Sequence, residues 1–320
     1  MSASTPAVRR SEGRWPVGTR PDGSAVELPY LRWEGGPGAH LYIGITIHGD
    51  EVTGQASMWR VAAWLEQSVL HGTVTTVPVQ NPEGFNYNVR GMHGRTIDPN
   101  RIYPGDPKGE TMERVTARIT EAALAADAAI DVHTAGWAMP YILLDPVADL
   151  DLAARTRALA RATGITLVDE FASEDYEKEG LAASLPPAVL AAGKPAFTLE
   201  LGGHGHIEWT QVEAGAVALR NAIRHLGIVA DESEGVHGVP AYEDEGRRRT
   251  DFFCDHGGLI EYVVRPGDRV ERGRRIARVR SVYGRVIEEI VAPRTGVVLA
   301  LSATSAVWSG AYLGEIAAED

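Results

Sequence analysis

Two metal-binding residue types lie close together in His48-Gly-Asp-Glu51, directly after the apolar run Leu41–Ile47. Imidazole nitrogens and carboxylate oxygens at this spacing suit a divalent metal, zinc above all. His133 also follows an apolar run and is the third candidate ligand. Two histidines and a glutamate leave one coordination position open, which is the arrangement of a catalytic zinc. A lone histidine is more often an ordinary surface or core residue, so the hypothesis requires these three residues to meet in space.

Glu200 ends a further apolar run, Ala196–Leu199, and is followed by Leu201-Gly-Gly203. A carboxylate buried there without a partner is costly, but beside a metal site it can take a proton from water and return it to a leaving amine. We therefore predict that Glu200 is the general base and acid; a salt bridge at the rim of a sheet is the alternative. Asp131 would face the same side of its strand as His133 and would orient that imidazole.

The segment from Asn81 to Arg101 is rich in turn-forming residues and arginine. Arginine binds carboxylates through a bidentate fork and can also stabilise an oxyanion. Beside a cationic metal site, this composition favours an anionic substrate, although a loop arginine is often merely solvated. His204 and His206 follow Glu200 in a glycine-rich segment. They are expected to be exposed, with a substrate contact or a second metal as alternatives.

These residues need elements to position them, and short apolar runs alternate with helical patterns over residues 1–230. This alternation favours an α/β sheet with helices on its faces. In such sheets ligands bind beyond the carboxyl ends of the strands, where the candidate site residues fall. Thr210 and Glu213 are spaced as a capping box, and Asp149 is a candidate N-cap. The predicted strands are 41–47, 73–79, 128–132, 141–144, 165–168 and 196–199, and the predicted helices are 52–67, 111–126, 150–163 and 210–226.

Residues 231–320 form a predicted second domain, beginning with the polar linker 231–242. From Arg247 onward, short alternating runs are separated by Gly and Pro turns, which indicates a small all-β unit. It resembles a biotinyl/lipoyl-like sandwich, but residues 231–320 contain no lysine for attachment, so a carrier role is excluded. A lid, a wall of the substrate channel or an oligomer contact remains possible for this unit. Its predicted strands are 259–264, 275–279, 285–291 and 297–301.

Composition narrows the class of protein. The 320 residues are 44% hydrophobic, enough for a sizeable core. The formal net charge of −12 argues against a nucleic-acid partner. Cys254 is the single cysteine, which excludes an internal disulfide, favours an inert thiol and fits a cytoplasmic location. The chain has no run of 18 apolar residues, so we expect no membrane span, and a homo-oligomer remains possible.

The motifs together resemble one known family. His48-Gly-Asp-Glu51, the Asn-Pro segment running to Asp98-Pro-Asn-Arg101, Asp131-Val-His133 and Leu199-Glu-Leu-Gly-Gly203 look like the succinylglutamate desuccinylase/aspartoacylase family of zinc carboxypeptidase-like deacylases. The resemblance covers roughly residues 40–205 in motif order. It implies a mixed central sheet flanked by helices and a smaller β-rich C-terminal domain.

The resemblance also implies roles for individual positions. His48, Glu51 and His133 would hold one zinc ion, and Glu200 would be the base. Asn100 and Arg101 would bind a substrate carboxylate, and Arg90 would polarise the scissile carbonyl, at a spacing to Asn100 similar to that in diaminobutyrate-deacetylase-like members. Pro99 departs from the usual leucine or methionine, and Arg95 competes with Arg90 for the oxyanion role.

The sequence therefore predicts a zinc-dependent amidohydrolase that removes an acyl group from an N-acylated amino acid or a similar small anionic amide. A metallocarboxypeptidase-like peptidase would use the same metal and base, and it is the first alternative. A non-catalytic binding protein on a hydrolase fold is the second. The acyl group and the amine are left open.

Overall fold

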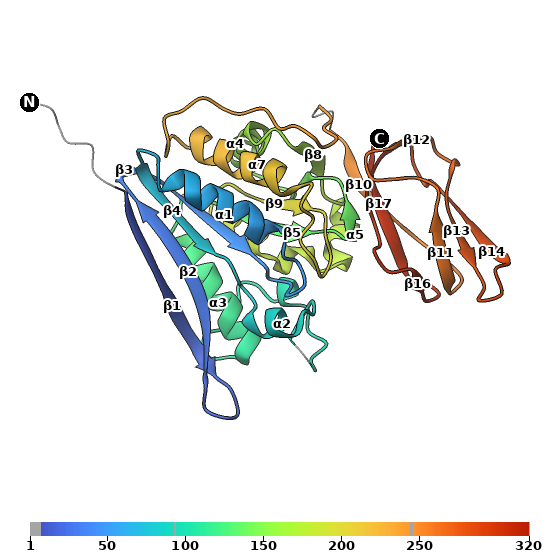
Figure 1. Ribbon diagram of the computed structural model, residues 1–320, viewed down its shortest axis with the longest axis horizontal. Helices are drawn as coiled ribbons and strands as arrows, with labels where there is room; N and C mark the ends of the chain where they lie inside the picture. Colours follow the sequence, from blue (N-terminus) through green and yellow to red (C-terminus); the bar gives the residue numbers. More distant parts are fainter. Residues whose placement is uncertain (1–7, 93, 244–245, 320) are drawn as a thin grey trace, which may run out of the picture.

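A computed structural model describes residues 8–92, 94–243 and 246–319. Within these residues a 13-stranded mixed sheet runs through the molecule, and a 4-stranded antiparallel sheet lies at its C-terminal end (Figure 1). The strand order in the large sheet is β1-β2-β4-β3-β5-β9-β7-β8-β10-β17-β15-β12, with β6 paired to β15. Helical layers, a mixed sheet and a smaller antiparallel sheet confirm the predicted fold class.

The centre of the large sheet carries the candidate site residues. Strands β3, β4, β5 and β9 are mutually parallel, β7 runs antiparallel to β9, and β8 is parallel to β7. Strand β3 alternates between two apolar layers, because Leu41 and Ile43 pack into one core and Tyr42 into the other. The bounds are β3 Gly36–Ile45, β4 His71–Val77, β5 Ala128–Thr134, β6 Trp137–Ala138, β7 Tyr141–Leu144, β8 Thr166–Asp169 and β9 Ala196–Leu201.

Helices cover both faces of this sheet (Figure 1). Helices α1, α4 and α7 pack in one layer, and α3 and α6 pack in the other. None of the helices in the described residues is long and apolar enough to cross a membrane. The bounds are α1 Thr53–Leu65, α2 Pro82–Tyr87, α3 Thr111–Leu124, α4 Leu150–Ala162, α5 Ser173–Lys178, α6 Leu185–Leu190 and α7 Val212–His225, with 3-10 turns η1 Pro99–Arg101 and η2 Leu181–Ala183.

Each predicted strand and helix of residues 41–226 corresponds to an observed element, with ends shifted by a few residues. Asp149 caps α4 as predicted, accepting bonds from the N–H groups of Asp151 and Leu152. The capping box at Thr210 is wrong, because α7 begins after Gln211 and the Thr210 hydroxyl donates to Glu208. The N-terminal hairpin was not predicted; its strands are β1 Arg9–Thr19 and β2 Ala25–Glu34.

The C-terminal unit is tied into the large sheet. Strand β10 pairs with β17 and meets β8 at Arg248 and Asp169. Strands β12 and β15 extend the same sheet, and the other four strands of the unit form the second sheet. The division at residue 230 stays a prediction. The bounds are β10 Arg248–Phe253, β11 Gly258–Tyr262, β12 Arg269–Val270, β13 Arg275–Arg280, β14 Val286–Val291, β15 Gly296–Leu301, β16 Ala306–Val307 and β17 Tyr312–Ala318.

Candidate metal centre and substrate cavity

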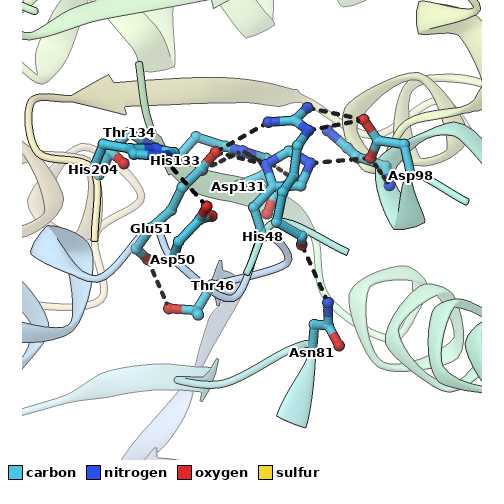
Figure 2. A network of polar contacts seen from close by, with 12 residues as sticks. Thr46, His48, Asp50, Glu51, Asn81, Asp98, Asp131, His133, Thr134 and His204 are labelled. Carbon is cyan, nitrogen blue, oxygen red and sulfur yellow. Dashed lines mark hydrogen bonds and ion pairs between the residues drawn. The ribbon is translucent and has the colours of Figure 1, made fainter. Parts of the chain in front are cut away.

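The three predicted ligands converge at the carboxyl ends of β3 and β5. His48 Nδ1 lies 2.7 Å from Glu51 Oε1, His133 Nδ1 lies 3.0 Å from Glu51 Oε2, and the two Nδ1 atoms are 3.2 Å apart. All three residues are buried, with 2 to 5% exposure. In the described part of the chain, they form the group of three side chains that could hold a metal ion (Figure 2).

The turn after β3 brings His48 and Glu51 together. Thr46 adopts a left-handed φ of 60°, and its hydroxyl donates to the carbonyl of Glu51 at 3.0 Å. Gly49 packs against the backbone of α2, where an added Cβ would lie 2.0 Å from the Gly84 carbonyl carbon. The Thr134 N–H then donates to Glu51 Oε2 at 3.0 Å, which fixes the carboxylate beside β5. The glycine of the motif is therefore required by close packing.

Each imidazole has a second carboxylate on the ring nitrogen that faces away from the centre. His133 Nε2 lies 2.9 Å from Asp131 Oδ2, as predicted, and His48 Nε2 lies 3.1 Å from Asp98 Oδ1 (Figure 2). Ionised carboxylates only accept hydrogen bonds, so both Nε2 atoms carry the hydrogen in the neutral rings and both Nδ1 atoms present lone pairs. Lone pairs facing one carboxylate at these distances repel one another unless a cation lies between them. The donor set therefore fits a divalent metal.

The electrostatics of the candidate centre also favour a bound cation. Burial would raise the pKa of Glu51, but the imidazoles of His48 and His133 hold it well below its usual range. Burial would lower the pKa of His133, yet the carboxylates of Asp131 and Glu51 raise it well above its usual range. The site thus favours a positive charge at the position where the three ligand atoms meet.

Glu200 stands one strand away from His133. The two residues are register partners on parallel β5 and β9, so their side chains share one face of the sheet. Burial raises the pKa of Glu200 to about 8, and its Oε2 is a buried atom without a hydrogen-bond partner among the described residues. A carboxyl group with a pKa near neutrality suits a group that accepts and returns a proton.

The arginine-rich segment divides into residues that face the cavity and residues that do not. Arg90, Asn100 and Arg101 line the same cavity as the three ligands, whereas Arg95 lines a separate one. Arg90 pairs with Asp98 at 2.9 Å and reaches Glu51 Oε1 at 3.4 Å. The location of Arg90 makes it the better placed of the two competing arginines.

The side chains of Asn100 and Arg101 have polar groups that are available to bind a ligand. Asn100 is 8% exposed, and its Oδ1 has no hydrogen-bond partner among the described residues. Within the described residues, Arg101 donates to the backbone carbonyls of Glu179 and Asn100, both at 2.8 Å. Burial lowers the pKa of Arg101, and no ion-pair partner is found for it in the described residues. A guanidinium without a carboxylate partner, facing a cavity, is suited to an anionic ligand.

The cavity has a volume of about 470 Å³, and the C-terminal unit supplies one of its walls. Arg249, Asp251, Tyr312 and Glu315 line it from β10 and β17, while Tyr141 lies between Glu200 and this wall. The sequence pattern did not indicate any of these residues, nor Asp98 as a partner of His48. The acid in Asp98-Pro-Asn-Arg101 was visible as part of a motif, but the C-terminal residues had no local signal.

The two histidines after Glu200 separate. His204 is half-exposed, lines the cavity and lies 3.6 Å from Asp50 Oδ2, whereas His206 bonds the backbone of His204 and lies outside the cavity. In the described residues neither belongs to a second group of three metal ligands. His204 is therefore the one of the pair that is placed for a substrate contact.

The sequence of this chain is similar to those of a known catalytic domain and of a curated enzyme. The succinylglutamate desuccinylase/aspartoacylase catalytic domain matches residues 37–226. An N-alpha-acetyl-L-2,4-diaminobutyric acid deacetylase from Halomonas elongata is 27% identical over 301 residues, which are 92% of this chain and 86% of that protein. These relatives are deacylases.

Two solved structures share the fold. A succinylglutamate desuccinylase from Silicibacter sp. TM1040 has a TM-score of 0.81 at 23% identity, over 99% of this chain and 97% of that one. The product-bound ectoine utilization protein EutE (DoeB) from Ruegeria pomeroyi has a TM-score of 0.84 at 24% identity, over 97% and 95% of the two chains. The family match covers more than half of the sequence and confirms the resemblance found in its motifs. The chain belongs to the succinylglutamate desuccinylase/aspartoacylase family.

Proposed function

We propose that this protein is a zinc-dependent amidohydrolase that removes the acyl group from an N-acylated amino acid. The observation that carries the proposal is the convergence of His48, Glu51 and His133, with Glu200 one strand away on the same face. The three candidate ligands and the Glu200 carboxyl group line one cavity, which supports this assignment. The deacetylase relative from Halomonas elongata supports an acetyl group as one candidate for the acyl part.

Each of these side chains would have its own role in the hydrolysis reaction. A zinc ion held by His48, Glu51 and His133 would supply Lewis acidity for activating water and polarising the acyl carbonyl. Glu200 would accept the proton of the attacking water and donate it to the departing amine. Arg90 would stabilise the negative charge that develops on the carbonyl oxygen, a contact worth on the order of 3 kcal/mol in other enzymes.

Asn100 and Arg101 would hold the carboxylate of the substrate. The Arg101 guanidinium and the Asn100 Oδ1 atom, which have no carboxylate partner and no hydrogen-bond partner respectively among the described residues, line the same cavity as Glu200. Fixing the carboxylate there sets the distance between the scissile bond and the metal, which converts binding energy into orientation.

The peptidase alternative uses the same metal and base, but the cavity argues for a small substrate. Ser302, Ala303, Thr304 and Tyr312 of the C-terminal unit line it, so the unit limits the room for a polypeptide. A volume of about 470 Å³ lies within the range of sites for small ligands. A non-catalytic binding protein would not need Glu200 beside the metal ligands.

The decisive experiment combines metal analysis with one isosteric change. The purified protein should contain about one zinc per chain, and hydrolysis of N-acetyl, N-succinyl and N-formyl amino acids should depend on it. Glu200→Gln should retain the zinc and lose turnover by at least about 100-fold, because an amide cannot transfer the proton. Glu271→Gln makes the same change at an exposed position and is the matched control. A near-normal rate in Glu200→Gln, or full activity without metal, would overturn the mechanism.

A further inference from the structure

A smaller pocket lies directly beside the substrate cavity. Its volume is about 180 Å³, and it shares three lining residues with the cavity, Gly136, His204 and Ala303. Two of these shared residues have a small side chain or none, so the half-exposed imidazole of His204 is the one bulky group among them. We call this space the side pocket; beyond the shared boundary its lining includes Trp137, Ala138, Gly202, His206, Glu208 and Gln211.

The side pocket and the carboxylate clamp formed by Asn100 and Arg101 lie on opposite sides of the candidate metal centre. Figure 2 shows His204 on one side of the three ligands and Asp98 on the other. Asp98 is tied to the clamp, because its carboxylate accepts the Asn100 N–H at 2.8 Å. An N-acyl amino acid joins its carboxylate and its acyl group through the amide that must reach the metal. With the carboxylate in the clamp, the acyl group therefore points toward His204.

Apolar residues continue beyond the boundary. Trp137 lines the side pocket and is 45% exposed, although its strand β6 is held in the sheet by pairing with Leu301 of β15. It also lines the next pocket, of about 400 Å³, together with Met139, Pro140 and Pro266. A large aromatic side chain on a fixed strand offers an apolar surface to a ligand at a low cost in conformational entropy. The walls beyond His204 thus suit a hydrocarbon chain.

The polar side chains of the side pocket already have partners within the protein. Gln211 Oε1 accepts the Gly202 N–H at 2.7 Å, and Gln211 Nε2 donates to the Ala138 carbonyl at 2.6 Å. The Glu208 carboxylate accepts the Thr210 hydroxyl at 2.6 Å. The carboxylate clamp differs, because its side chains keep polar groups without such partners in the described residues. A polar ligand group is therefore matched at the clamp, whereas the side pocket favours an apolar one.

We propose that the side pocket binds the hydrocarbon chain of the acyl group, so that the protein selects amino acids whose N-acyl chain is apolar and longer than acetyl. This inference rests on the proposed deacylase function. The acyl carbonyl would lie at the metal centre, and the chain would pass His204 and end against Trp137. Water would cleave the amide bond and release the longer carboxylic acid and the free amino acid.

Four acyl groups on one amino acid test the proposal. The amino acid is the one whose N-acyl derivatives are hydrolysed fastest, and it carries an acetyl, butanoyl, hexanoyl or succinyl group. Each methylene that becomes buried should raise kcat/KM about threefold, so the hexanoyl substrate should exceed the acetyl substrate by at least about tenfold. Butanoyl should also exceed succinyl, which has the same chain length but ends in a carboxylate.

The results separate this inference from the deacylase function. A smaller ratio of hexanoyl to acetyl hydrolysis would overturn the side-pocket proposal and leave the deacylase function intact. A preference for succinyl over butanoyl would overturn it as well, because the imidazoles of His204 and His206 would then be recognising an anion. If no N-acyl amino acid is hydrolysed, the proposed function fails and this inference fails with it.

Two variants then locate the preference. Trp137→Ala removes an apolar wall of the side pocket, and Ala303→Leu narrows its boundary with the substrate cavity at an exposed position. Each should reduce the ratio of hexanoyl to acetyl kcat/KM by about tenfold. Trp59→Ala makes the first change on α1, where Trp59 is 58% exposed, and should leave the ratio unchanged. Zinc content and the midpoint of urea denaturation report that each variant is folded. An undiminished ratio in both side-pocket variants would overturn the assignment.

Discussion

At the scale of single residues, the candidate metal centre depends on carboxylates that do not face the metal position. Asp98 connects three parts of the site: it contacts His48 Nε2, accepts the N–H of Asn100 at 2.8 Å and pairs with Arg90. Burial would raise the pKa of Asp98, but His48 and Arg90 hold it well below its usual range. Asp98 therefore remains ionised, orients the imidazole and increases its basicity toward a metal.

Asp98→Asn should accordingly weaken zinc binding by roughly 10- to 100-fold, because the amide keeps the shape of the side chain and loses its charge. Titration of the metal-free protein with zinc, in competition with a chelator, measures this affinity. Asp255→Asn, the same change at an exposed position, should bind zinc like the wild type. Equal affinities for Asp98→Asn and wild type would mean that His48 does not depend on this carboxylate.

Arg101 is the residue on which the carboxylate clamp depends. Arg101→Gln should raise KM for N-acyl amino acids by about 10- to 100-fold with a small change in kcat, because it removes binding that is uniform along the reaction. N-acyl amines without a carboxylate should be unaffected. Arg95→Gln is the control, since Arg95 lies on the same segment but outside the cavity. An equal loss on both kinds of substrate would exclude a carboxylate contact.

At the scale of elements, the strand ends made the site predictable. His48, His133 and Glu200 follow apolar runs that are short enough to be strands, and parallel neighbours bring their carboxyl ends to one edge. The cavity wall that β10 and β17 supply was not predictable in this way. It depends on β10 meeting β8 at Arg248 and Asp169, a pairing between segments about 80 residues apart that no local period encodes.

The turn between β3 and α1 packs closely against α2 at Gly49. Gly49→Ala should push the turn away from α2, because the new methyl group would meet backbone atoms of Gly84 and Phe85 that cannot move aside. We expect a loss of about 1 to 3 kcal/mol in the free energy of unfolding and a reduced zinc content. Urea denaturation and metal analysis measure the two effects. Gly18→Ala adds a methyl group where nothing lies within 4 Å, so it should be nearly neutral. A stable, fully metallated Gly49→Ala protein would contradict the packing argument.

At the scale of the whole molecule, the C-terminal unit and the sheet that carries the candidate metal centre share one hydrogen-bonded framework. The Asp169 N–H donates to the Arg247 carbonyl at 2.8 Å, and β6 pairs with β15. Buried side chains add to this connection, because the Tyr141 hydroxyl donates to Glu315 and Arg249 pairs with Glu170. Loss of the C-terminal strands would therefore remove a wall of the cavity and expose the edge of β8.

This continuity predicts that the molecule unfolds as one cooperative unit. Six of the seven tryptophans precede residue 231, so fluorescence reports on the part of the chain that holds the candidate metal centre. Cys254, the single cysteine, is 1% exposed within the C-terminal unit. As urea is raised, reaction of the Cys254 thiol with a disulfide reagent should begin at the same concentration as the change in fluorescence. Cys254→Ser should show no reaction and supplies the background. If the thiol became reactive well before the fluorescence changed, the C-terminal unit would open separately, and the cavity wall that it supplies would be mobile.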